Sequence, residues 1–161
     1  MNSSPTAAVA VLDDDDDVAS SLADLLSAHG LPAVAYQSVN GLSAAIAQRE
    51  FAAFVLDWFL GDTTASDLIV RLRSDLRLAR APIFLHSGNL AVGGVPQDPE
   101  LIAAIRRHRL HFRAKPYSPA RLAQDLVLEL TKTRINVLVP EAPDALAQRG
   151  SGVRARSTYR T

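Results

Sequence analysis

Five polar side chains stand directly after short apolar segments of the chain. They are Asp13, Asp14, Asp57, Ser87 and Lys115. Carboxylate oxygens without histidine or cysteine are ligands for a hard divalent cation such as Mg²⁺. A cation held by carboxylates keeps open positions for phosphate oxygens, and a lysine adds a mobile positive charge for the same anion. These residue types predict phosphoryl chemistry in which a carboxylate can act as the nucleophile.

The apolar segments have the length of β-strands and alternate with segments of helical spacing. They lie at 7–12, 33–36, 52–56, 82–86 and 110–114. Apolar strands joined by helices predict a parallel sheet covered on both faces, because right-handed crossovers place helices above and below it. The predicted fold is a doubly wound α/β fold with one five-stranded parallel sheet. Its ligand sites lie at the carboxyl ends of the strands, where the five polar side chains would meet.

Capping residues mark the ends of several predicted helices. Gly30 is expected in the left-handed conformation after the first helix. Asp98 and Ser118, each followed by a proline, are expected to start the fourth and fifth helices. The segment 88–98 between strand and helix is glycine-rich and is expected to form a flexible loop.

The five consecutive aspartates are expected to have separate roles. Asp13 and Asp14 lie nearest the strand, so their side chains should emerge on the edge that faces Asp57. Asp15 and Asp16 are expected to be solvated loop acids. Asp17 is expected to cap the first helix.

Composition bounds the class of protein. The 161 residues have a net charge of zero, but residues 1–131 carry 11 Lys/Arg against 15 Asp/Glu while 132–161 carry 6 against 2. We expect one domain at 6–132 and a basic, flexible tail at 133–161, in which INVLVP at 135–140 is a candidate extra strand. There is no nucleic-acid footprint, membrane span, secretory signal or cysteine, which indicates a cytoplasmic protein.

Four motifs in order resemble the receiver domain of bacterial two-component response regulators, the CheY-like superfamily. They are VLDDDDDV, FVLDWFL, PIFLHSG with a hydroxyl five places after proline, and FRAKPYSP. The resemblance covers residues 6–132 and implies the sheet order 2-1-3-4-5. One departure is Gly61, which stands where the family usually has proline.

The resemblance implies a phosphoacceptor and a metal site. Asp57 would be the acceptor of the phosphoryl group. Mg²⁺ would be held by Asp13, Asp14, Asp57 and the backbone carbonyl of Phe59.

The resemblance also implies a switch. Lys115 would pair with the phosphoryl group, Ser87 would be the hydroxyl that turns toward it, and Phe112 would be the aromatic ring that reorients. The added charge and acceptor oxygens would thereby change the surface around the fourth and fifth units.

The implied function is that of a stand-alone, single-domain response regulator. Its phosphoryl donor would be a sensor histidine kinase or a histidine phosphotransfer protein, and its output an unidentified protein partner. The 30-residue tail is too short and unpatterned for a DNA-binding domain. Self-phosphorylation and autodephosphorylation with Mg²⁺ are the only enzymatic activities expected.

Two other functions compete with this interpretation. Asp14 and Asp16 fit the nucleophile motif of haloacid dehalogenase-type phosphatases, with Ser87, Lys115 and the pair Glu141 and Asp144 in the later motifs. That function leaves Asp57 without a role. The second competing function is that of a docking module, which would have the receiver fold but would not be controlled by phosphorylation. The four histidines suggest no ligand set in either case.

Overall fold

A five-stranded parallel sheet forms the centre of the molecule, which a computed structural model describes at residues 7–88 and 91–138. The strands are β1 (Ala8–Leu12), β2 (Ala33–Tyr36), β3 (Phe51–Asp57), β6 (Ile83–Ser87) and β9 (His111–Ala114). Their order across the sheet is β2-β1-β3-β6-β9, and every neighbouring pair is parallel. This confirms the predicted fold and strand order.

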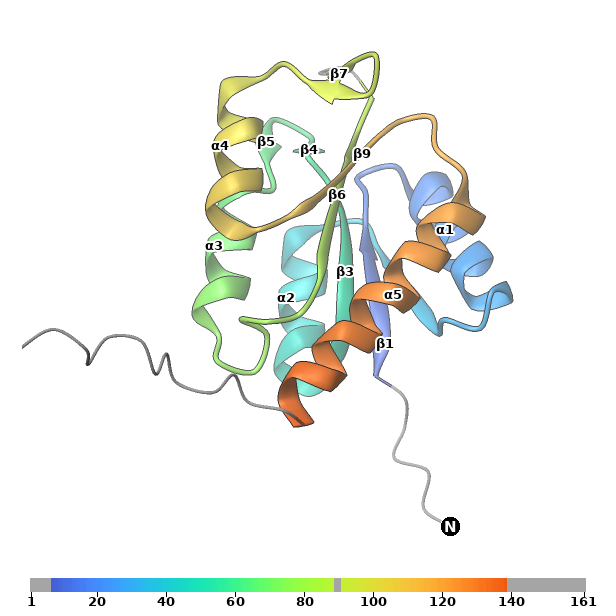
Figure 1. Ribbon diagram of the computed structural model, residues 1–161. Coiled ribbons are helices and arrows are strands. Elements are labelled where there is room, and N and C mark those ends of the chain that lie inside the picture. The colour runs from blue at the N-terminus through green and yellow to red at the C-terminus, as the bar shows by residue number, and fades with distance from the viewer. Residues whose placement is uncertain (1–6, 89–90, 139–161) are drawn as a thin grey trace, which may run out of the picture.

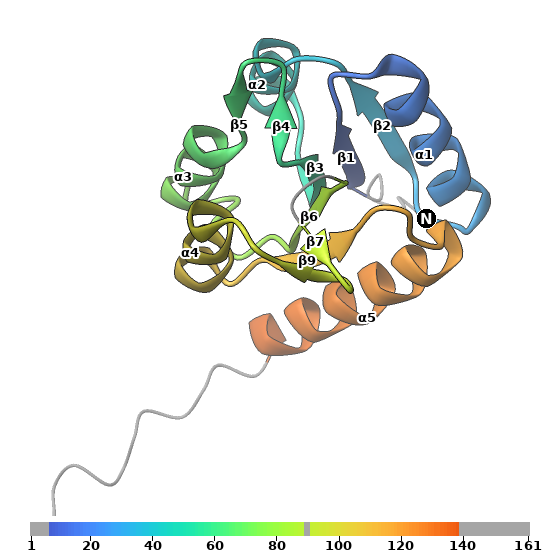
Figure 2. The ribbon, with the colours of Figure 1, turned by 90° about the horizontal axis from the view of Figure 1, so that it is seen from above.

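Helices cover both faces of the sheet (Figures 1 and 2). They are α1 (Asp16–Ala28), α2 (Val39–Gln48), α3 (Ser66–Ser74), α4 (Pro99–His108) and α5 (Pro119–Leu138). The side chains of α1 and α5 pack on one face, and those of α2, α3 and α4 on the other. No helix in the described ranges combines the length and the apolar character needed to cross a membrane.

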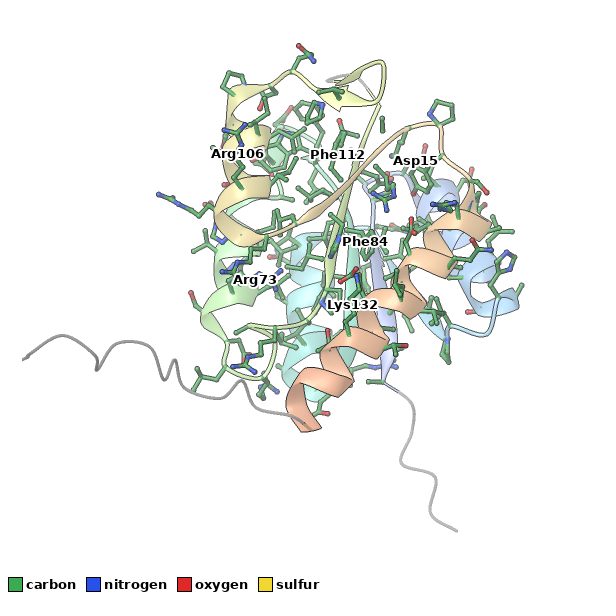
Figure 3. All side chains as sticks on the ribbon, in the orientation of Figure 1. Asp15, Arg73, Phe84, Arg106, Phe112 and Lys132 are labelled. Carbon is green, nitrogen blue, oxygen red and sulfur yellow. The ribbon has the colours of Figure 1, made fainter. Side chains whose placement is uncertain are left out.

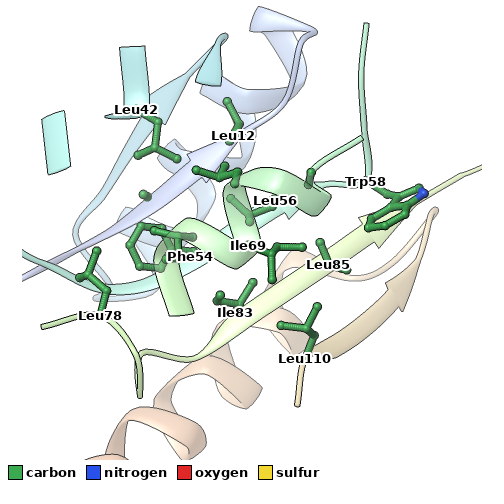
Figure 4. Close-up of a cluster of buried hydrophobic side chains, with 14 of the residues drawn as sticks. Leu12, Leu42, Phe54, Leu56, Trp58, Ile69, Leu78, Ile83, Leu85 and Leu110 are labelled. Atoms are coloured by element: carbon green, nitrogen blue, oxygen red, sulfur yellow. The ribbon is translucent and has the colours of Figure 1, made fainter. Parts of the chain in front are cut away.

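Alternating strand residues fill the two cores. On the α2, α3 and α4 face, Leu56 and Leu85 lie with Ile69 in a cluster of fully buried side chains (Figure 4). On the α1 and α5 face, Val55 and Phe84 do the same with residues of the two helices. A strand places successive side chains on opposite faces, so each apolar strand supplies both cores.

The register of the sheet brings the strand ends to one edge. Leu12 pairs with Leu56, Asp57 with His86, and Ser87 with Ala114. Because all five strands run the same way, the polar residues at their carboxyl ends share that edge.

Helix α1 begins two residues earlier than the sequence predicts. Its N-cap is Asp15, whose carboxylate accepts hydrogen bonds from the backbone N–H groups of Asp17 at 3.0 Å and Val18 at 3.2 Å. Asp16 and Asp17 lie in the first turn, where negative charge favours the helix dipole. The prediction of Asp17 as the cap is therefore wrong, and so is the loop position of Asp16, whereas Asp15 is exposed and lies outside the helix as its cap.

The other predicted helix ends are confirmed. Gly30 has φ of +84° after α1. Asp98 caps α4 by accepting a hydrogen bond from the N–H of Leu101 at 2.7 Å. The Ser118 hydroxyl accepts one from the N–H of Arg121 at 3.4 Å as α5 begins.

Two segments differ from the sequence-based expectation. The expected loop at 88–98 holds a short hairpin, β7 (Ala91–Val92) and β8 (Val95–Pro96). The candidate strand at 135–140 is wrong for 135–138, because α5 continues to Leu138. Once a helix is nucleated, each added residue gains a hydrogen bond at small propensity cost, even at β-branched positions. The rest of the predicted tail, 139–161, lies outside the described residues.

Arg73 ties α3 to the end of α4 (Figure 3). Its Nε donates to the backbone carbonyl of His108 at 3.2 Å. Its Nη1 donates to the carbonyls of Ala81 at 2.8 Å and Ala79 at 3.3 Å. One guanidinium therefore joins α3, the segment before β6 and the C-terminal end of α4.

The packing of β6 gives a direct test of the fold. Leu85 is fully buried, whereas Leu76 is 96 % exposed in the turn after α3. Leu85→Ala should lower the free energy of unfolding by about 2–5 kcal/mol, because it removes buried methyl groups and leaves a cavity. Leu76→Ala should change it by less than about 0.5 kcal/mol. Urea unfolding measures both, and equal losses would contradict the described core.

Candidate functional site

Three of the predicted site residues meet at the carboxyl edge of the sheet. The Nζ of Lys115 lies 2.8 Å from Oδ2 of Asp13 and 3.6 Å from Oδ1 of Asp57. Asp57 is the last residue of β3, Asp13 follows β1, and Lys115 follows β9. The backbone N–H of Lys115 donates to the carbonyl of Ser87 at 2.9 Å, which continues the sheet pairing to the lysine. Strands far apart in sequence thus place two carboxylates around one ammonium.

Asp13 is almost completely buried, with an exposed fraction of 1 %. Its Oδ1 accepts a hydrogen bond from the N–H of Asp15 at 3.1 Å, and its Oδ2 accepts from Lys115. A buried carboxylate is unfavourable unless a cation and hydrogen bonds compensate it. Lys115 is the cation that does so here.

Asp14 points to a different partner. Its side chain is exposed, and its Oδ2 accepts a hydrogen bond from the N–H of Gly61 at 3.0 Å. Gly61 has φ of +65° in the turn between β4 (Phe59–Leu60) and β5 (Thr63–Thr64). The carboxylate is still near enough to raise the pKa of Asp57.

The pKa of Asp57 is raised to about 6. Burial is the main cause, and the negative charges of Asp13 and Asp14 add to it, while the positive charge of Lys115 opposes the shift. Asp13 and Asp57 therefore share Lys115, and the Asp14 carboxylate adds a third negative charge nearby. Such a site gains free energy from a further cation, so its donors fit the divalent metal that the sequence implies.

His86 lies in this site, although sequence reasoning left all four histidines outside any ligand set. Asp13, Asp57 and His86 each offer a ligand atom within 4.8 Å of the other two. The pKa of His86 is lowered to about 3 by burial and by the positive charge of Lys115. The sequence held one indication of this position. His86 stands next to Ser87 at the carboxyl end of its strand, and there it pairs with Asp57 of the neighbouring strand.

A tyrosine holds the His86 ring. The hydroxyl of Tyr117 lies 2.8 Å from Nδ1 of His86, and Nε2 lies 3.8 Å from Oδ2 of Asp13. Burial and the charges of Asp13 and Asp57 raise the pKa of Tyr117, so its hydroxyl is neutral.

Ser87 and Phe112 lie on the opposite face of the sheet. Ser87 is fully buried, and its Oγ has no hydrogen-bond partner within 7–88 and 91–138. Phe112 pairs with Leu85 and packs half-buried against the core on the α4 side (Figure 3). Ser87 and Phe112 are therefore on one face, with the ring farther from the site edge.

Phe59 begins β4 two residues after Asp57, and its side chain is 37 % exposed. Its backbone pairs with Thr64 of β5. The role of its carbonyl as a metal ligand stays a prediction.

Comparisons with solved structures identify the fold. A sensor protein from a Polaromonas species has a TM-score of 0.67 and 24 % identity, covering 80 % of this chain and 99 % of its own. A CheY-like response regulator receiver domain protein from Methanospirillum hungatei has a TM-score of 0.69 and 15 % identity, covering 81 % and 98 %. The chain has the receiver-domain fold. The receiver domain of a signal transduction histidine kinase from Syntrophus aciditrophicus is also similar, at a TM-score of 0.66 and 16 % identity over 79 % and 92 %.

The likeness to these receiver domains is found by comparison of structures and not by comparison of sequences. No family model and no curated protein sequence matches the chain.

The raised pKa of Asp57 makes the stability of this receiver fold depend on pH. The folded-state pKa of about 6 exceeds the ordinary 3.8, so folding favours the protonated carboxyl. The stability that folding gains from the protonated Asp57 carboxyl is fully present below about pH 4 and is lost as pH rises through about 6. Asp57→Asn stays neutral, so in EDTA it should be more stable than the wild type at about pH 7.5, with a gain that shrinks toward pH 4. Urea unfolding at several pH values measures this.

Asp62→Asn is the control, because Asp62 is exposed in the turn between β4 and β5. It should keep the wild-type pH dependence. If Asp57→Asn gave no gain at high pH, burial would not destabilise the Asp57 carboxylate.

Proposed function

We propose that this protein is a phosphoaccepting receiver, with Asp57 as the acceptor of a phosphoryl group from a sensor histidine kinase or a histidine phosphotransfer protein. The observation that carries this proposal is the half-buried Asp57 carboxylate beside Lys115 and Asp13 at the carboxyl edge of the sheet. The neighbouring structures, which include sensor and response regulator proteins, support a role in two-component signalling. Such a protein would work in the cytoplasm.

The transfer needs a nucleophile and charge neutralisation. An Oδ of Asp57 attacks the phosphorus, and the bond from phosphorus to the donor imidazole nitrogen breaks with its electron pair left on that nitrogen. Lys115 lies 3.6 Å from Asp57, within a short movement of the incoming phosphoryl oxygens. A bound Mg²⁺ would neutralise the developing charge, held by Asp13 and Asp57 and, as the resemblance implies, by Asp14 and the Phe59 carbonyl.

The switch would use the unpaired hydroxyl of Ser87. An acyl phosphate adds strong acceptor oxygens next to the end of β6. Ser87 can donate to one of them, since its Oγ has no hydrogen-bond partner in the described chain. Movement of Ser87 would free space on the α4 face, into which Phe112 turns, and the altered surface would bind a downstream protein.

The phosphatase alternative is less well supported. Its motif needs Asp16 beside Asp14 at the nucleophile. Asp16 is exposed in the first turn of α1, where its carboxylate accepts a hydrogen bond from the Ser20 hydroxyl at 3.3 Å. Glu141 and Asp144, its last acids, lie outside the described residues.

Intact mass spectrometry after incubation with Mg²⁺ and acetyl phosphate tests the acceptor. The wild type should gain one phosphoryl group, and Asp57→Asn should gain none because the nucleophile is absent. Asp16→Asn is the matched control and should be phosphorylated like the wild type. Turnover of phosphate monoesters that depends on Asp14 and not on Asp57 would instead establish the phosphatase. A wild type without an adduct would favour the docking module.

Ser87→Ala separates phosphorylation from the response. The variant should still take up the phosphoryl group, and its free energy of unfolding should be unchanged or about 1 kcal/mol higher, since it loses a buried hydroxyl without a partner. The change in the NMR signals of the Phe112 ring on phosphorylation should be lost. Ser20→Ala, on the exposed side of α1, should keep that change. A full response in Ser87→Ala would contradict the switch.

A further inference from the structure

His86 presents an unpaired nitrogen to the two carboxylates of the site. The residue is 1 % exposed, and Nε2 has no hydrogen-bond partner within the described ranges. Asp57 and His86 are register partners in neighbouring parallel strands, so their side chains leave the same face of the sheet. Nε2 lies 3.8 Å from Oδ2 of Asp13 and therefore faces the carboxylates of the site and not the apolar core.

The Tyr117 contact is compatible with the tautomer that such a nitrogen needs in order to bind a cation, because a hydroxyl can accept as well as donate. Burial keeps the imidazole uncharged, so only one of its nitrogens carries a proton. With the proton on Nδ1, that N–H donates to the Tyr117 hydroxyl, which is 2.8 Å away. Nε2 then has a free lone pair. Histidine ligands of metals commonly donate their other N–H to such a second group.

The three ligand atoms have a spacing suited to one ion. They all lie within 4.8 Å of one another. Metal–ligand bonds of about 2.1 Å place ligands on opposite sides of an ion about 4.2 Å apart. Small side-chain rotations would therefore bring the three ligand atoms to within bonding distance of one ion.

We propose that Nε2 of His86 is a metal ligand together with Asp13 and Asp57, and that this set prefers a first-row transition ion such as Mn²⁺ or Co²⁺ to Mg²⁺. Imidazole nitrogen suits transition ions, whereas Mg²⁺ is bound by oxygen ligands and water. This inference rests on the proposed function, because it concerns the cation of the same site. Tyr117 is a positioning residue that orients the ligand.

Lys115 links the ion to the phosphoryl acceptor. It lies 2.8 Å from Oδ2 of Asp13, the oxygen nearest to the imidazole. A cation held by this set would compete with the Lys115 ammonium for the carboxylates of Asp13 and Asp57.

Pulsed EPR of the untagged full chain loaded with Mn²⁺ tests the proposal. The spectrum should show modulation from an imidazole nitrogen, and His86→Gln should abolish it. His29→Gln is the control, because His29 is exposed at the end of α1, and it should keep the modulation. Absence of the modulation in the wild type, or its persistence in His86→Gln, would overturn the proposal.

Competition titrations with Co²⁺ and Mg²⁺ give a second readout. The affinity ratio of Co²⁺ to Mg²⁺ should fall at least about tenfold in His86→Gln and stay unchanged in His29→Gln. Tyr117→Phe should weaken Co²⁺ binding about tenfold through loss of the second group. An equal ratio in the wild type and in His86→Gln would count against the imidazole ligand.

A variant in which His86 is the single remaining histidine keeps the test valid even if His86→Gln does not fold. It carries glutamine at positions 29, 108 and 111, none of which is buried, and should retain the nitrogen modulation. Phosphorylation by acetyl phosphate with Mg²⁺ separates the two proposals. Modulation without a phosphoryl adduct would overturn only the acceptor role of Asp57, and an adduct without modulation would overturn only the imidazole ligand.

Discussion

The buried carboxylate of Asp13 needs a positive charge, and much of the arrangement of the site follows from how the fold supplies it. Asp13 follows β1, the second strand in the sheet order, and Lys115 follows the edge strand β9. Their 2.8 Å contact spans 102 positions of sequence and reaches over the ends of β3 and β6. Asp57 and His86 lie at those two ends. The ion pair therefore compensates the buried charge of Asp13, and it spans the two strand ends that carry Asp57 and His86.

Strand β6 divides the site between the two faces of the sheet. His86 and Ser87 are consecutive, so the imidazole lies with Asp13 and Asp57 while the hydroxyl lies with Phe112. Two consecutive residues of β6 therefore contribute to the two faces of the sheet. The backbone joins β6 to the end of β3 at this point, because the N–H of Trp58 donates to the carbonyl of His86 at 3.0 Å.

The parallel sheet and the meeting of Asp13, Asp57 and Lys115 were predictable, because the ends of strands can be read from the local sequence and parallel strands share one edge. The strand order came from the resemblance to receiver domains. The N-cap was not, because five identical aspartates carry no sequence signal that separates Asp15 from Asp17. His86 was missed for a different reason. A histidine inside an apolar strand resembles a core residue until the register of the neighbouring strand is known. The hydrogen bond from Gly61 to Asp14 depends on a positive φ that sequence alone does not fix.

One of the three backbone acceptors of Arg73 lies in helix α4, and the other two lie before β6. The guanidinium donates to the carbonyl of His108 at the C-terminal end of the helix, which lies far from the carboxyl edge of the sheet. The other end, at Pro99, follows the β7–β8 hairpin and the carboxyl end of β6. The first turn of α4 is also anchored, because Leu101 is fully buried in the core beside α3. Both ends of the helix are therefore fixed, and α3 and α4 form one packed unit on this face of the sheet.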